Sequence, residues 1–220
     1  MKRLTLGIVF VIAFCVVLSS LLTACGSSTT TAGSTPTTTT ANIKTTAPAS
    51  TMPKESKNSV STVPSAASVK PGDTFDVAIR VTNEQPSRGM QFSLMWDPSK
   101  VECTSVDQGG YYKDFAAANK GELFLIPSDK PVADNDAGVF PKTNDPLHQM
   151  MIAMQDAHDA GGTPLGVTGT GDVFILHMAV KSGASGQVDF TLSQVLLSDA
   201  SLEPKDMKPD VINGKITITP

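Results

Sequence analysis

A cysteine that follows small residues at the end of an apolar run carries the clearest chemistry in this sequence. Two basic residues precede the apolar stretch, which ends in Leu22-Thr23-Ala24-Cys25. This order of positive charge, apolar stretch and small-residue cleavage site is typical of a secretory signal. The tetrapeptide matches a lipobox, in which the cysteine thiol receives a diacylglycerol and becomes the new N-terminus. We therefore expect a lipoprotein signal peptide over residues 1–24 and lipidation of Cys25.

A transmembrane anchor is the alternative interpretation of this segment, because the apolar stretch is near the lower limit for a membrane-spanning helix. The short basic start and the polar, low-complexity tail after Cys25 favour the lipid anchor. Acyl anchoring leaves the whole mature chain on one side of the bilayer. We therefore expect a cell-membrane protein on the extracytoplasmic face, exposed at the cell surface.

The remaining nucleophiles and imidazoles form no catalytic pattern. His148, His158 and His177 have neither the His-x-x-x-His nor the Cys-x-x-Cys spacing of metal sites. The glycine-rich run 166–171 precedes a predicted strand, so it has no helix terminus with which to hold a phosphate. Cys103 has no disulfide partner once Cys25 is lipidated; we interpret it as a buried strand residue, with an exposed, dimerising thiol as the alternative. The sequence therefore predicts a protein that is not an enzyme and holds no cofactor.

Three loop carboxylates, Asp129, Asp134 and Asp136, could supply hard oxygen ligands to Ca²⁺. Their spacing matches no EF-hand loop, and Asp is common in turns for conformational reasons. We therefore predict no metal site.

Composition divides the rest of the chain in two. Residues 25–59 are mainly Ser, Thr, Ala and Pro and cannot bury enough apolar surface to offset their ordering entropy, so we expect a disordered, O-glycosylatable linker. Residues 60–220 have the length of one domain. Removing Lys2 and Arg3 with the signal lowers the formal net charge from −4 by two, to −6. No basic cluster remains, which excludes the usual electrostatic footprint of nucleic-acid binding.

Alternation of apolar and polar residues dominates residues 60–220 and predicts strands. In 74–81 the residues Phe75, Val77, Ile79 and Val81 share one face, and in 90–96 Met90, Phe92, Leu94 and Trp96 do the same. Further strands are predicted at 101–106 (with a bulge), 121–126, 148–155, 172–181, 187–197 and 211–219, the last turning on Asn213-Gly214. The segments 127–146 and 156–171 are predicted to be loops, and 111–119 is the one helix candidate. This pattern predicts an all-β sandwich or jelly roll whose terminal strands meet.

The order of several short motifs resembles the cohesin domain family. These motifs are Val69-Lys70-Pro71-Gly72-Asp73-Thr74-Phe75, Leu94-Met95-Trp96-Asp97-Pro98, Met151-Ile152-Ala153 with Gln155-Asp156-Ala157, and Gly169 through Gly183. The resemblance covers about residues 61–220. It implies a nine-stranded jelly-roll β-sandwich that binds dockerin, a Ca²⁺-dependent protein partner, on one sheet face.

By this resemblance, the partner-binding residues are the outward positions Gln91, Ser93 and Met95, with Gln155 and Asp156 nearby. Gly89 and Gln91 stand where the well-studied subclass has Asn and Asp, which is a departure from its pattern. Together with the anchor and the linker, the resemblance implies a lipid-anchored surface module that docks dockerin-bearing or other proteins.

A carbohydrate-binding module of the related cellulose-binding sandwich type, with a polysaccharide ligand, is the alternative function. Such modules need aromatic platforms for sugar rings. The chain has one tryptophan, Trp96, and the parity of its predicted strand points this side chain inward. Its two tyrosines, Tyr111 and Tyr112, are adjacent in the sequence.

Overall fold

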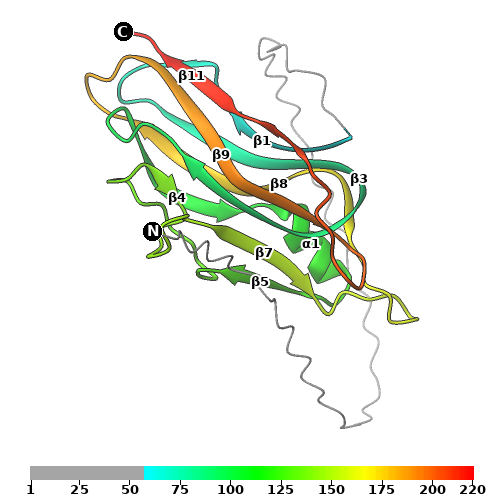
Figure 1. Ribbon diagram of the computed structural model, residues 1–220. Helices are drawn as coiled ribbons and strands as arrows, with labels where there is room; N and C mark the ends of the chain where they lie inside the picture. Colours follow the sequence, from blue (N-terminus) through cyan, green and yellow to red (C-terminus); the bar gives the residue numbers. More distant parts are fainter. Residues whose placement is uncertain (1–56) are drawn as a thin grey trace, which may run out of the picture. The chain divides into compact units, whose positions relative to one another are not determined.

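The computed structural model describes residues 57–220. The strands are β1 Asn58–Pro64, β2 Ser68–Val69, β3 Thr74–Met95, β4 Val101–Gln108, β5 Glu122–Ile126, β6 Val139–Phe140, β7 Met150–Gln155, β8 Val167–Val180, β9 Gly186–Asp199, β10 Asp210–Ile212 and β11 Gly214–Ile218, with the helix α1 Gly110–Ala118 after β4 (Figure 1). The expected signal peptide and lipidated Cys25 lie outside these residues, as does the linker up to residue 56. Within 57–220, no helix is long and apolar enough to span a bilayer.

The 22-residue strand β3 belongs to both layers of the sandwich. Its first half pairs with β1 and β8, and its second half pairs with β9 on one side and with β6 and β7 on the other. The first layer therefore runs β10-β1-β3-β8-β4, and the second runs β2-β11-β9-β3-β7-β5. Where two separate strands were predicted at 74–81 and 90–96, the chain stays extended between them. If the two halves of β3 are counted separately and the short strands β2, β6 and β10 are left out, the sandwich has the nine strands expected.

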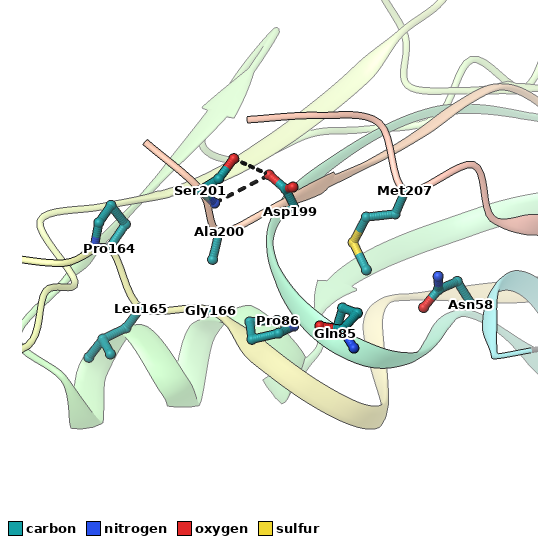
Figure 2. Close-up of a pocket in the computed structure, with 10 residues that line it drawn as sticks. All are labelled: Asn58, Gln85, Pro86, Pro164, Leu165, Gly166, Asp199, Ala200, Ser201 and Met207. Carbon is teal, nitrogen blue, oxygen red and sulfur yellow. Dashed lines mark hydrogen bonds between the residues drawn. The ribbon is translucent and has the colours of Figure 1, made fainter. Parts of the chain in front are cut away.

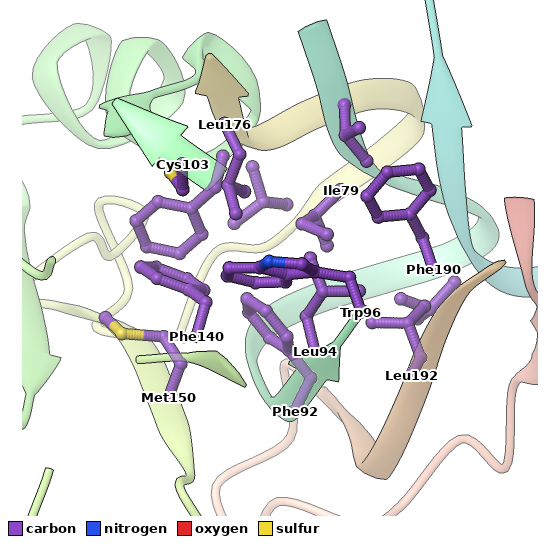
Figure 3. Close-up of a cluster of buried hydrophobic side chains, with 14 of the residues drawn as sticks. Ile79, Phe92, Leu94, Trp96, Cys103, Phe140, Met150, Leu176, Phe190 and Leu192 are labelled. Atoms are coloured by element: carbon purple, nitrogen blue, oxygen red, sulfur yellow. The ribbon is translucent and has the colours of Figure 1, made fainter. Parts of the chain in front are cut away.

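The predicted alternation of the core is confirmed. All eight inward residues named above for 74–81 and 90–96 are buried. Figure 3 shows Phe92, Trp96 and Phe140 packed together between the layers. The bulge expected in β4 is also present, between Cys103 and Ser105.

Two glycine-containing segments differ from their predicted structure. Strand β8 begins at Val167, inside the predicted loop, and a Cβ on Gly171 would lie 2.7 Å from the Tyr111 ring, so packing explains that glycine. Asn213-Gly214 does not form a hairpin turn: β10 pairs with β1 in the first layer and β11 with β9 in the second. A Cβ on Gly214 would lie 2.5 Å from the carbonyl oxygen of Thr62, whose hydroxyl accepts the Gly214 N–H. Close backbone approach, not turn geometry, therefore requires a glycine at 214.

Helix α1 closes the sandwich where β3 changes layers. The Tyr111 hydroxyl donates to Asn83 Oδ1 at 2.5 Å, and the Tyr112 and Ser87 hydroxyls share a 2.6 Å hydrogen bond. The Asn83 amide donates in turn to the carbonyl of Val167, at 2.9 Å. These bonds satisfy polar groups at the crossing, where the β3–β8 register shifts between Asn83 and Ser87.

The contact between β3 and β7 tolerates no side chain at Gly89. A Cβ there would lie 2.6 Å from the carbonyl oxygen of Ile152 and 3.2 Å from the Cα of Ala153, both backbone atoms. We expect Gly89→Ala to force these strands apart and to lower the free energy of unfolding by about 1–3 kcal/mol, as overpacking does. Denaturant unfolding measures this change. The control is Gly161→Ala, whose Cβ would meet only the Asp159 side chain, at 3.3 Å; equal losses in the two variants would contradict the prediction.

Candidate functional site

The groups that could carry out chemistry serve structural roles. Cys103 is buried, and burial raises the pKa of its thiol to about 11, so the thiol is neither exposed nor ionised. The Asn135 side chain bonds both backbone groups of Cys103, accepting its N–H at 2.7 Å and donating to its carbonyl at 2.8 Å. The Asp134 carboxylate accepts the N–H groups of Asp136 and Ala137. The Asp-rich loop is thus fastened to the β4 bulge, and residues 57–220 contain no cluster of three or more His, Cys, Asp or Glu side chains arranged to hold a metal.

The aromatic residues that a glycan platform would need are inside the protein. Trp96 and both tyrosines are buried, and the two tyrosine hydroxyls are engaged at the β3 crossing. Both tyrosines lie on α1, in the segment predicted to be a helix. The sandwich therefore presents no tyrosine or tryptophan face to a sugar ring.

A cavity of about 510 Å³ lies at the end of the sandwich where β3 changes layers (Figure 2). Its lining includes Pro86, Leu165 and Met207, and its single ionisable residue is Asp199. Burial acts to raise the pKa of that carboxyl, but hydrogen bonds from Ser201 and Lys205 outweigh it and lower the pKa. The ionised Asp199 carboxylate accepts hydrogen bonds from the N–H and the hydroxyl of Ser201 and so organises a loop. None of the other residues that line the cavity is a catalytic partner for it.

The outer face of the second layer, formed by β5, β7, the second half of β3 and β9, carries exposed apolar side chains. We call it the β5–β9 face. Phe124 is 46% exposed, Ile126 42%, Leu196 37% and Met95 45%. Strand pairing puts Ile126 beside Met151, Met151 beside Gln91, and Gln91 beside Leu196, so one row crosses all four strands. The adjacent row runs through Phe124, Ala153 and Gly89. These residues, distant in sequence, form one continuous surface.

The predicted partner-binding residues lie on this face or at its edge, with one correction. Gln91 lies at the centre, where its amide donates to the Gln194 carbonyl at 3.4 Å, and Met95 is exposed farther along β3. Gln155 is exposed at the end of β7, and Asp156 follows it at φ 57°. Ser93 is only 2% exposed. Its outward parity was expected to expose it, but the β3–β9 pairing shifts register between Gln91 and Ser93, and Ser93 lies buried beside Ser193.

Three exposed apolar residues of this face were not among the predicted binding residues: Phe124, Ile126 and Leu196. The signal for the first two was present: the pentapeptide Glu122–Ile126 is apolar at four consecutive positions although its strand is short. Leu123 and Leu125 pack against the core, which leaves Phe124 and Ile126 facing outward. Contiguous exposed apolar residues of this kind are typical of interaction surfaces.

The outer face of the first layer is polar, as expected for a solvated sheet. His177 on β8 contacts Asp76 on β3 through Nδ1, at 2.7 Å, and Asp107 on β4 through Nε2, at 3.1 Å. Arg80 forms a two-pronged ion pair with Asp172, at 2.7 and 3.2 Å. These pairs tie neighbouring strands together across the face.

Stability should depend on pH through His177. Hydrogen bonds that the His177 imidazole donates to the carboxylates of Asp107 and then Asp76 raise the pKa of His177 above its ordinary value. A raised pKa adds stability that is fully present below the unfolded-state pKa of about 6.5 and is lost as the pH rises through the folded-state pKa. We expect the melting temperature of the parent chain to exceed that of His177→Gln at acidic pH, and the difference to shrink on the alkaline side. Thermal unfolding at a series of pH values measures it; a difference that grew with pH would contradict this assignment.

Comparison with known proteins shows which family this fold belongs to. The sequence matches the cohesin domain family over residues 59–218. Among solved structures, the third cohesin of ScaC from Acetivibrio cellulolyticus, in complex with the ScaB dockerin, is 16% identical, with 73% of this chain and 99% of that chain covered and a TM-score of 0.50. A type II cohesin domain from the cellulosome of the same organism is 15% identical, with coverages of 73% and 95% and a TM-score of 0.51. The OlpA cohesin–Doc918 complex of Clostridium thermocellum is 13% identical, with coverages of 74% and 100% and a TM-score of 0.50. No curated protein matches the sequence.

Proposed function

Since the chain belongs to the cohesin domain family, we propose that it is a non-catalytic docking module that binds a dockerin-bearing protein on its β5–β9 face. The exposed apolar row on that face carries the proposal. Monomeric proteins rarely expose contiguous apolar patches unless another molecule covers them. Two of the similar cohesins were solved with a dockerin, which supports the choice of partner class.

We further propose that the module is held at the cell surface through Cys25, with residues 25–59 as the tether. The lipobox and the polar composition that follows it support this arrangement. Cys25→Ser removes the thiol that would carry the acyl chains, so it should release the protein from the membrane fraction and abolish incorporation of a labelled fatty acid. Retention of the variant in the membrane without label would favour the apolar stretch as a transmembrane anchor.

Docking can be tested with a panel of purified dockerin domains, each titrated into the full-length chain with Ca²⁺ and with a chelator. We expect at least one dockerin to bind in Ca²⁺ and to lose binding in the chelator. Failure of every dockerin to bind in Ca²⁺ would refute the dockerin assignment.

A further inference from the structure

We propose that two copies of this chain associate through the free edge of β5, so that the second layers of two sandwiches join into one continuous antiparallel sheet. The dimer uses the edge of the sheet rather than its outer face, so it forms whether or not a dockerin binds. Two observations carry it: the backbone groups that β5 leaves unpaired, and the order of its five residues, Glu122–Ile126.

Strand β5 lies at the margin of the second layer, and β7 is its single strand partner (Figure 1). The carbonyl of Met154 on β7 accepts a hydrogen bond from Arg88 Nε on β3, at 2.9 Å, so the backbone groups of Met154 face β3. Its partner on β5, Leu123, therefore directs its own N–H and C=O away from β7. Because backbone direction alternates along a strand, Leu125 does the same. Within residues 57–220, no hydrogen bond from a loop or a side chain reaches these outward groups.

Of the four sheet edges formed by residues 57–220, the other three carry features that block pairing with another chain. On β4, the Asn135 side chain occupies both backbone groups of Cys103, and a bulge lies between Cys103 and Ser105. Strand β10 is three residues long and begins at the exposed Asp210, and β2 is two residues long. Shortness, charge, bulges and coverage are the means by which proteins prevent edge-to-edge association. Strand β5 pairs with β7 in an unbroken register and contains no lysine, proline or bulge, so its edge is open to another strand.

The order of residues in β5 makes a second copy the partner that fits. Its central Leu-Phe-Leu reads the same in both directions, so two antiparallel β5 strands pair about a two-fold axis at Phe124. Leu123 then lies opposite Leu125 of the second copy. The two such pairs exchange two hydrogen bonds each, which satisfies every outward N–H and C=O of both leucines. Glu122 lies opposite Ile126 of the second copy, so no like charges meet, and the two Phe124 rings form a cross-strand aromatic pair.

Sedimentation equilibrium of the full-length chain in detergent tests the association. A five-residue edge buries less surface than a standard interface, so we expect a weak dimer with a dissociation constant of about 0.01–1 mM. Phe124→Lys places like charges directly opposite each other across the axis and should weaken the dimer by about tenfold or more. Ile126→Lys is the matched control on the same side of the strand: the introduced lysine lies opposite Glu122 of the second copy, so the dimer should be at least as strong as the parent.

Both substituted side chains are exposed, so the melting temperature should stay unchanged in both variants. A parent chain that shows no dimer at about 1 mM would overturn the proposal. So would equal weakening of the dimer by the two lysine variants, because only the two-fold register distinguishes position 124 from position 126.

Cross-linking tests the register directly. In the proposed pairing the Cα atoms of the two Phe124 residues are about 4.5 Å apart, within reach of a disulfide, whereas the antiparallel offset separates the two Ile126 residues by about 14 Å. We expect Phe124→Cys, and not Ile126→Cys, to form an interchain disulfide on mild oxidation. Both are made with Cys15→Ser and Cys25→Ser, so that the remaining native thiol is the buried Cys103. Equal cross-linking of the two variants, or cross-linking of neither, would refute the edge-paired dimer.

Discussion

A double variant with Phe124→Asp and Ile126→Asp is expected to bind dockerin about a thousandfold or more less tightly. Each hot-spot residue of an interface can contribute about 2 kcal/mol or more to binding, and each 1.4 kcal/mol corresponds to about a tenfold change in affinity. These side chains are 46% and 42% exposed on β5, at the edge of the β5–β9 face. Aspartate in either position removes apolar contact area from the proposed interface and places a carboxylate there, where it loses hydration on binding. Calorimetric titration with a Ca²⁺-loaded dockerin measures the loss.

The fold should survive these changes because both side chains point away from the core. The neighbouring Leu123 and Leu125, which pack inward, are retained. Val211→Asp provides the control: it adds a carboxylate at a residue of similar exposure, 44%, on β10 outside the face. Binding by the double variant within tenfold of the parent, with an unchanged melting temperature, would show that the partner binds elsewhere.

The sequence was most informative where a short-range pattern decides the structure. Period-two alternation identifies the buried residues of β3 because successive side chains on a strand point to opposite faces. The continuity of β3 was missed because residues 82–89 are polar and include Pro86, which predicts a turn. That segment is held extended by hydrogen bonds from Tyr111 and Tyr112, which are more than twenty residues away in sequence.

The β5–β9 face, where we propose that docking occurs, was only partly predictable for the same reason. Parity placed Gln91 and Met95 on the outer side of β3, but it carries no information on how deep a short residue such as Ser93 lies. Leu196 reaches the face through a register shift in the β3–β9 pairing, near Gln194 at φ 53°. Such shifts depend on cross-strand packing and leave no local signature in the sequence.

The largest stability effect is expected from Phe174→Ala, because this ring joins the two layers. Phe174 is fully buried on β8 in the first layer, 5.9 Å from the ring of Phe92 on β3 and 5.5 Å from that of Phe140 on β6. Truncating a buried phenylalanine to alanine costs about 3–5 kcal/mol, from lost burial and the cavity left behind. A domain with a total stability of about 5–15 kcal/mol would lose a large share of it. Denaturant unfolding followed by the fluorescence of Trp96, the single tryptophan of the chain, measures the change.

Phe124→Ala supplies the matched control, because it deletes the same side chain from the exposed β5–β9 face. It should change the free energy of unfolding by no more than about 0.5 kcal/mol, as surface substitutions do, while weakening dockerin binding. Phe174→Ala should lower the free energy of unfolding but leave dockerin affinity unchanged at temperatures where the variant remains folded, because the Phe174 ring does not reach the β5–β9 face. The two phenylalanines thus separate what holds the sandwich together from what the sandwich presents. Comparable losses of stability in both variants would mean that Phe124 supports the core, and the case for β5 as a docking strand would fail.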